Sequence, residues 1–250
     1  MPKRDNLLSE RVADDLLERI IAEELAPGSV LPPERELQEH YQVSRTVVRE
    51  AIKLLSARGL INASAGQHAL VGADLTGPAA EALLLAFRRA QVATEDVLST
   101  RQLFEPQIAA MAAQTATNVQ IRQLKHLCQT FARISEEYTE QTGSEAKNRE
   151  RWVHFDGQFH HMIAQATQNP ALIILMEVIG IMWRQYINQG IDFSPEHRAK
   201  GVQHHLDITA AIADRDAERA RQAMIKHLET TSNYLRQIGK LDSEQPIKSP

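Results

Sequence analysis

The chain has 250 residues, of which 43% are hydrophobic and 24% are charged, and its formal net charge is −4. This share of apolar residues predicts a folded core and excludes wholesale disorder. The acidic balance excludes a globally basic nucleic-acid binder, although it leaves room for a local basic patch. The single cysteine, Cys128, excludes an internal disulfide and a cysteine-based zinc site and is typical of a cytosolic protein.

Neither a membrane span nor an export signal is expected. The longest apolar runs, residues 171–176 and 178–183, are separated by Glu177 and fall short of a span. The N-terminal residues lead into an amphipathic stretch instead of the plain apolar stretch of a secretory signal. We therefore expect a cytoplasmic protein that has no contact with a membrane.

The first third of the chain predicts three short helices. Apolar spacing places them over about 10–25, 34–41 and 45–58. Ser9 and Ser44 are natural N-caps for the first and third helices. Gly59 suits the left-handed position that follows the end of the third.

A β-hairpin is predicted to follow these helices. Two short strand patterns, at 60–63 and 69–71, flank the turn signal Ala65-Gly66. Three helices and a hairpin in this order predict a winged helix-turn-helix domain over residues 9–72. A linker is expected at 73–77.

The remainder of the chain reads as long helices. Their expected positions are about 78–91, 94–116, 118–138, 148–167, 170–189, 196–213 and 215–238. Helices of this length and spacing predict an antiparallel bundle over residues 78–238, followed by a flexible tail at 239–250. The expected fold class is therefore mainly α, with a winged helix-turn-helix followed by an all-α helical domain.

The third predicted helix carries a basic face that is suited to DNA. Arg45 and Arg49 are four residues apart and therefore share one face, opposite the apolar side. In a winged helix-turn-helix this helix enters the major groove, where an arginine can hydrogen-bond guanine O6 and N7 with both arms. Ser44 and Thr46 are short donors suited to phosphate oxygens. From charge alone, a solvated amphipathic face remains the alternative.

Three segments form a specific pattern in this region: Pro-Gly-Ser-Val-Leu-Pro-Pro-Glu-Arg-Glu-Leu (27–37), Val-Ser-Arg-Thr-Val-Val-Arg-Glu-Ala-Ile-Lys-Leu-Leu (43–55) and Arg-Gly-Leu-Ile (58–61). Together they resemble the winged helix of the GntR family of regulators. The resemblance implies that Arg35, Arg45 and Arg49 contact DNA. It also makes Gly66 and His68 candidates for wing contacts, although this wing lacks the second glycine of the usual Gly-x-Gly-Thr-x-Val ending.

Histidines gather on the inward faces of the later helices. Asp156 and His160 are four residues apart, His205 is better placed on its apolar stripe than His204, and His227 lies on the stripe of the last helix. Three imidazoles and a carboxylate that converge would suit a borderline divalent ion, most favourably Zn²⁺, with Ni²⁺ or Mn²⁺ as alternatives. From spacing alone, core histidines that bind no metal are the more frequent explanation.

The motifs around these residues are Asp156-x-x-x-His160, the segment that starts at His205-Leu-Asp-Ile-Thr, and Ala223-Met-Ile-Lys-His227. They resemble the FCD effector domain of FadR-type GntR regulators. The resemblance implies that Asp156, His160, His205 and His227 hold a metal ion. It also implies that Arg101 binds the carboxylate of a small effector, whereas an arginine paired with Glu105 is the alternative.

We therefore predict a DNA-binding transcription regulator, and not an enzyme. A homodimer is expected, because two reading helices on a two-fold axis match a palindromic operator on double-stranded DNA. Repression is the commoner behaviour of the family that the chain resembles. The effector class stays open among sugar acids, including sialic acid, and small hydroxy- or keto-acids. The alternatives are a metal-dependent hydrolase with an accessory DNA-binding domain and a regulator whose histidines bind no metal.

Overall fold

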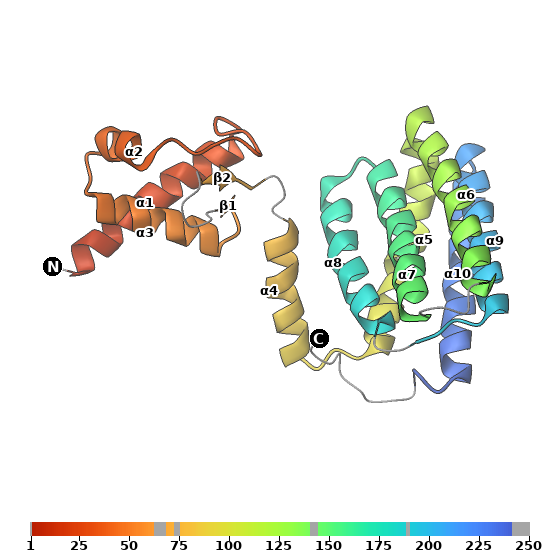
Figure 1. The fold of residues 1–250 in the computed structure, drawn as a ribbon. Coiled ribbons are helices and arrows are strands. Elements are labelled where there is room, and N and C mark those ends of the chain that lie inside the picture. The colour runs from red at the N-terminus through yellow and green to blue at the C-terminus, as the bar shows by residue number, and fades with distance from the viewer. Residues whose placement is uncertain (1, 63–68, 73–75, 141–144, 189–190, 242–250) are drawn as a thin grey trace. The chain divides into compact units, whose positions relative to one another are not determined.

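The computed structural model describes residues 2–62, 69–72, 76–140, 145–188 and 191–241. It divides into two compact units, Met1–Ala82 and Leu83–Pro250, and each unit is described by itself (Figure 1). Helices dominate both units, in agreement with the predicted fold class.

The first unit contains three helices and a two-stranded antiparallel sheet. The elements are α1 (Pro2–Ile21), α2 (Glu34–Tyr41), α3 (Arg45–Ala57), β1 (Ile61–Asn62) and β2 (Leu70–Val71). Ile61 lies opposite Val71 in the sheet, and Val30 forms a further antiparallel bridge to Leu70. The predicted winged helix-turn-helix is therefore confirmed. Residues 63–68, which include the predicted tip of the hairpin, lie outside the described residues.

The first helix differs from its prediction at both ends. Ser9 was expected to cap it, but this residue is buried inside α1, which also ends at Ile21 and not at Leu25. Leu8 lies four residues before Val12 and packs against the same core. The apolar stripe thus extends beyond the expected start of the helix, and a serine inside that stretch cannot act as its cap.

The turn into α3 has the predicted features. Ser44 is the N-cap of α3, and its Oγ accepts a hydrogen bond from the backbone N–H of Val47 at 3.4 Å. Gln42 ends α2 with a left-handed φ of 52°, and Gly59 adopts a φ of 73° after α3. The buried side of α3 consists of Val47, Val48, Ala51 and Leu55. Because this side packs against α1, the opposite face of α3 is left to solvent.

The second unit is a bundle of long helices, which Figure 1 shows side by side. Its helices are α5 (Thr94–Thr115), α6 (Asn118–Glu140), α7 (Glu145–Ala166), α8 (Pro170–Ile187), α9 (Pro195–Ala213) and α10 (Ala217–Gln237). All lie close to their predicted positions. The two units divide within α4 (Thr76–Arg89). Thr76 and Gly77, which the sequence assigned to the linker, are therefore already helical.

Helix α5 is central to the bundle, since it packs against α7, α8, α9 and α10. Ala109, Ala112 and Ala113 on this helix are completely buried. Their small side chains allow neighbouring backbones to approach closely, so one helix can contact four others. Arg101 and Glu105 lie in the same helix and are also buried, which places a charged pair inside the bundle.

Helix α8 is the most apolar helix of the second unit. By length and composition alone it is able to cross a membrane, with a mean hydropathy of 1.3 over 18 residues, so Glu177 does not exclude a span as the sequence suggested. However, 39% of that stretch is buried within the protein. Met176 and Trp183 join the core clusters of the bundle. One such helix is weak evidence for a span, because the core helix of a soluble protein passes the same test.

The N-cap of α8 provides a test of how this helix is stabilised. Asn169 is its N-cap, and its Oδ1 accepts hydrogen bonds from the backbone N–H groups of Ala171 at 3.1 Å and Leu172 at 3.4 Å. We expect Asn169→Ala to lower the free energy of unfolding by about 1 kcal/mol. Urea unfolding followed by tryptophan fluorescence measures this, because both tryptophans, Trp152 and Trp183, lie in the second unit.

Asn169→Ser is the matched control, because serine retains an oxygen that caps the helix. We expect it to unfold at nearly the wild-type urea concentration. An alanine variant as stable as the serine variant would contradict the capping role.

Candidate metal centre and nucleic-acid interface

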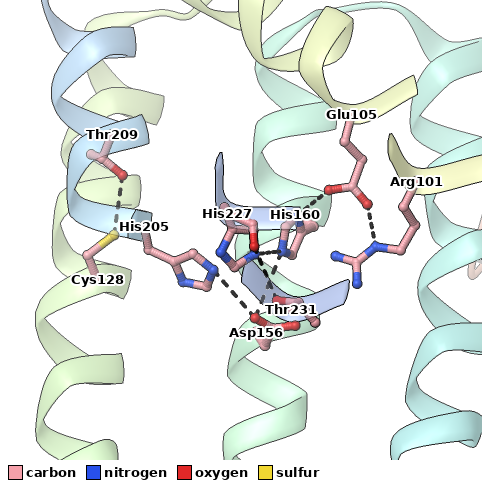
Figure 2. A network of polar contacts seen from close by, with 9 residues as sticks. All are labelled: Arg101, Glu105, Cys128, Asp156, His160, His205, Thr209, His227 and Thr231. Atoms are coloured by element: carbon pink, nitrogen blue, oxygen red, sulfur yellow. Dashed lines mark hydrogen bonds and ion pairs between the residues drawn. The ribbon is translucent and has the colours of Figure 1, made fainter. Parts of the chain in front are cut away.

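Three helices bring one aspartate and three histidines together inside the bundle (Figure 2). Helix α7 supplies Asp156 and His160, α9 supplies His205, and α10 supplies His227. All four side chains are buried, and one ligand atom from each lies within 4.8 Å of the others. The structure thus brings together the four residues that the sequence singled out as candidate metal ligands.

The nitrogen and oxygen atoms of this group face one another. His205 Nε2 lies 3.4 Å from Asp156 Oδ1, and His160 Nε2 lies 3.8 Å from the same oxygen. His227 Nε2 lies 3.2 Å from His160 Nε2. Two imidazole nitrogens at this distance are an unfavourable pair when both carry a lone pair, and a cation that accepts both lone pairs removes that conflict.

Aromatic packing fixes the ring of His205. The ring stacks on Phe159 with a centroid distance of 3.9 Å and an interplanar angle of 16°, and Phe131 lies against it at 5.0 Å. His205 is only 1% exposed. Its neighbour His204 is also buried but is not a member of the group. The sequence had favoured His205 over His204 as the inward-facing histidine.

A buried ion pair adjoins the group. Arg101 Nε donates to Glu105 Oε1 at 2.5 Å, and Glu105 Oε2 lies 2.5 Å from His160 Nδ1. The Arg101 guanidinium also lies over the ring of Trp183, 4.5 Å from its centroid. Sequence reasoning had considered Glu105 only as a partner of Arg101, and its contact with His160 was missed.

Electrostatics keep the two acids of this centre ionised. Burial alone would raise the pKa of Asp156, but the nearby imidazoles of His205 and His160 hold that pKa well below its usual range. Burial likewise opposes ionisation of Glu105, but Arg101 and His160 outweigh it and lower its pKa to about 2. Both carboxylates therefore carry negative charge at neutral pH.

The pKa values of two imidazoles of the centre are lowered as well, which favours the uncharged form of each ring. Burial lowers the pKa of His205 to about 4, despite the opposing effect of Asp156. Burial, together with His205 and His160, lowers the pKa of His227 well below its ordinary value. Both rings are therefore neutral at pH 7, and a neutral imidazole has the lone pair that a metal ion needs.

This donor set fits a divalent ion. An aspartate oxygen and three imidazole nitrogens suit borderline metals such as zinc. Moreover, His205 Nε2, the ring atom that faces Asp156, is buried without a hydrogen-bond partner among the described residues, which is a costly arrangement for a histidine that serves only to fill a core.

The candidate DNA-reading residues lie on the exposed face of α3. The side chains of Arg45 and Arg49 are 70% and 59% exposed, and Ser44 and Thr46 are exposed beside them. In α2, Glu34 Oε2 lies 2.7 Å from Arg45 Nε, and Glu34 Oε1 lies 3.8 Å from Arg49 Nε. The sequence analysis had missed this acid, which holds both arginines at the start of the helix.

The remaining DNA candidates are Arg35, Gly66 and His68. Arg35 on α2 is 87% exposed and pairs with Glu39, with 3.0 Å between Nε and Oε1. Gly66 and His68, the candidate wing residues, lie outside the described residues.

Comparisons with known proteins agree with both units. Residues 8–71 match bacterial regulatory proteins of the gntR family, and residues 96–230 match the FCD domain. The HTH-type transcriptional repressor NanR of Klebsiella aerogenes is 29% identical over 238 residues, which cover 93% of this chain and 87% of that protein. The Uxu operon transcriptional regulator of Escherichia coli is 32% identical over 222 residues, which cover 86% of this chain and 82% of that protein.

A solved structure shares the fold. Streptococcus agalactiae GntR superposes with a TM-score of 0.71 and 24% sequence identity, over 90% of this chain and 99% of that one. At this identity the likeness concerns the fold alone.

The donor set leads to a prediction about metal content. Protein purified without chelator or acid should contain about one divalent ion per chain by elemental analysis. We expect His205→Ala or His227→Ala to weaken zinc binding by more than about tenfold, since even a change in an outer-shell partner typically costs about 10–100-fold. Added zinc should also raise the melting temperature, because an ion that binds only the folded state stabilises it.

His204→Ala is the matched control, because His204 is buried next to His205 but lies outside the group. It should leave zinc affinity close to that of the wild type. A larger loss in His204→Ala than in His205→Ala would show that the wrong member of the pair was assigned.

Proposed function

The chain belongs to the GntR family of bacterial regulatory proteins and carries an FCD domain, and from this we propose a transcriptional repressor that a small organic acid controls. The protein would bind a palindromic operator as a homodimer, because two reading helices related by a two-fold axis match two half-sites. The relatives are transcription regulators and not enzymes. The alternative of a metal-dependent hydrolase is therefore set aside.

The observation that carries the proposal is the buried group of Asp156, His160, His205 and His227 within the region that matches the FCD domain. Zn²⁺ suits its donors best, with Ni²⁺ or Mn²⁺ as alternatives. When bound, such an ion supplies a Lewis acid for oxygen atoms of a small acid. The chain itself supplies the fixed donors, which the bundle shields from water.

Arg101 is the proposed contact for the carboxylate of the effector. Its Nε is used by Glu105, whereas a guanidinium has further N–H donors on its two terminal nitrogens. Figure 2 shows this end of Arg101 pointing toward the side of the group that contains Asp156 and His160. An acid held there would accept charge-assisted hydrogen bonds from Arg101, which are stronger than neutral ones.

DNA recognition is assigned to the exposed face of α3. Arg45 and Arg49 would read base edges in the major groove, while Ser44, Thr46 and Arg35 would contact the backbone. The ion pairs from Glu34 restrict the reading arginines before DNA arrives, which reduces the conformational entropy that binding costs. Gly66 and His68 remain proposed wing contacts.

Repression and cytoplasmic location are proposed from the relatives. The NanR proteins of Klebsiella aerogenes, Cronobacter sakazakii and Salmonella newport are named transcriptional repressors, and a protein that binds operator DNA works in the cytoplasm. Sugar acids, including sialic acid, and small hydroxy- or keto-acids all have the carboxylate that Arg101 would bind. Nothing in the proposed site chooses among them.

The first prediction of the proposal concerns Arg49. We expect Arg49→Ala to weaken specific operator binding by about 1–3 kcal/mol and to relax base preference at one position in each half-site. Selection from a random duplex pool supplies the operator, and fluorescence anisotropy against single-base variants measures the loss. Arg89 in α4 is exposed and lies outside α3, so Arg89→Ala serves as the control. Unchanged discrimination in Arg49→Ala would refute the assignment.

The second prediction concerns the sensor. The acids that raise the melting temperature of the zinc-loaded protein are first selected from sialic acid, glucuronate, lactate and pyruvate. An active acid should weaken operator binding by about 1–3 kcal/mol, the usual range of coupling between two sites. Arg101→Lys should bind the operator like the wild type but lose this response. Lysine retains a positive charge for Glu105, whereas alanine would leave a buried carboxylate uncompensated.

A lysine variant that releases the operator at the wild-type concentration of acid would show that Arg101 is not part of the sensor. A wild-type protein that binds DNA but responds to none of the acids, with or without zinc, would contradict the proposed control by this class of effector.

A further inference from the structure

We propose that Glu105 is a positioning residue of the metal centre, which fixes the ring of His160 for metal binding and joins that ring to Arg101. This inference rests on the proposed function, because it concerns the same site. Glu105 belongs to α5, whereas the candidate metal ligands belong to α7, α9 and α10. It therefore adds a fourth helix to the centre.

The short contact between Glu105 and His160 favours one tautomer of the His160 ring. Glu105 Oε1 accepts from Arg101 Nε, and its other oxygen lies 2.5 Å from His160 Nδ1. A nitrogen and a carboxylate oxygen only 2.5 Å apart need a proton between them, and this contact places that proton on His160 Nδ1. In a neutral imidazole the lone pair is then on Nε2. This is the atom that faces His227 Nε2 at 3.2 Å and Asp156 Oδ1 at 3.8 Å.

Glu105 thereby prepares His160 before any ion arrives. A carboxylate on the second nitrogen of a metal-binding histidine fixes the ring orientation and the tautomer and makes the ligand more basic. Among the described residues no carboxylate lies against Nδ1 of His205 or His227, and the carboxylate contact of His205 is made at Nε2. Of the three candidate ligand histidines, only His160 is held in this way within the described part of the chain.

The same carboxylate also connects the ligand to the proposed effector contact. Arg101 and Glu105 are four residues apart on one helix, and their side chains are 4% and 2% exposed. Water therefore screens their interaction little. A change in the position or charge environment of the Arg101 guanidinium acts on Glu105 and, through it, on His160.

A structural explanation competes with this role, in which Glu105 only neutralises Arg101. The two explanations predict different zinc affinities for Glu105→Gln. A carboxylate accepts from both Arg101 and His160, whereas an amide has one accepting oxygen and a nitrogen that only donates. The variant can therefore satisfy one of the two partners. If the role is only to neutralise Arg101, neither the His160 tautomer nor zinc affinity depends on the second oxygen.

The chain offers a matched control one position along α7. His161 Nδ1 lies 2.9 Å from Glu177 Oε2, in a similar histidine–glutamate pair that is about 30% exposed and outside the group of metal-ligand candidates. Glu177→Gln removes the same charge from the same unit and leaves the neighbours of His160 in place.

The test uses full-length protein and zinc alone. Competition with a chromophoric chelator should show that Glu105→Gln binds zinc about 10–100-fold more weakly than the wild type, the usual cost of losing an outer-shell partner. Glu177→Gln should match the wild type. Equal zinc affinity in Glu105→Gln and the wild type would overturn the proposal.

A second measurement needs no variant and remains decisive if Glu105→Gln folds poorly. Long-range ¹H–¹⁵N NMR of the metal-free wild type reports the tautomer of His160, and we expect a protonated Nδ1 and an unprotonated Nε2. The opposite tautomer would overturn the role of Glu105. Wild-type protein that binds no zinc would instead contradict the metal centre of the proposed function, and the tautomer would still test Glu105.

Discussion

Burial of one carboxylate and three imidazoles in the middle of a helical bundle is the constraint on which the second unit depends. Each of these groups loses its hydration, and the loss must be recovered from partners inside the protein. Asp156, His160, His205 and His227 recover part of it from one another, and a shared divalent ion would recover the rest. The surrounding helices are arranged to make this convergence possible. Helix α5 contributes the buried charged pair Arg101 and Glu105, followed along the chain by small alanines that allow close packing.

The same constraint bears on the proposed role as a sensor. An acid bound near Arg101, as proposed, would meet donors that are already oriented, because Glu105 and Trp183 hold the guanidinium. Little conformational entropy is then lost on binding. Linkage requires that any effect of the acid on DNA affinity be matched by an equal effect of DNA on the affinity for the acid. The reading face of α3 is organised in a comparable way, with Glu34 between Arg45 and Arg49.

The sequence predicted the fold well because long amphipathic helices dominate it. The four candidate ligands followed from the family resemblance. Periodicity added only that Asp156 and His160 share one helix face and that His205 and His227 lie on apolar stripes. The Glu105–His160 contact joins residues 55 positions apart on different helices, and no spacing rule connects them. Arg101-x-x-x-Glu105 was the only available signal, and it suggested an ion pair without its third member. Glu34 was missed for the same reason. Ser9 was wrongly predicted to be an N-cap because serine is a common capping residue. The apolar stripe of α1 continues past Ser9 to Leu8, so Ser9 lies inside the helix.

X-ray absorption spectroscopy of the zinc-loaded protein tests the central claim most directly, because it counts the ligands of the ion. We expect three imidazole nitrogens at about 2.0–2.1 Å and carboxylate oxygen at about 2.0–2.2 Å, and no sulfur. Removal of His160, His205 or His227 should lower the imidazole count by one in each case. A spectrum with sulfur from Cys128, or with fewer than three imidazoles in the wild type, would contradict the assignment of Asp156, His160, His205 and His227 as the metal centre.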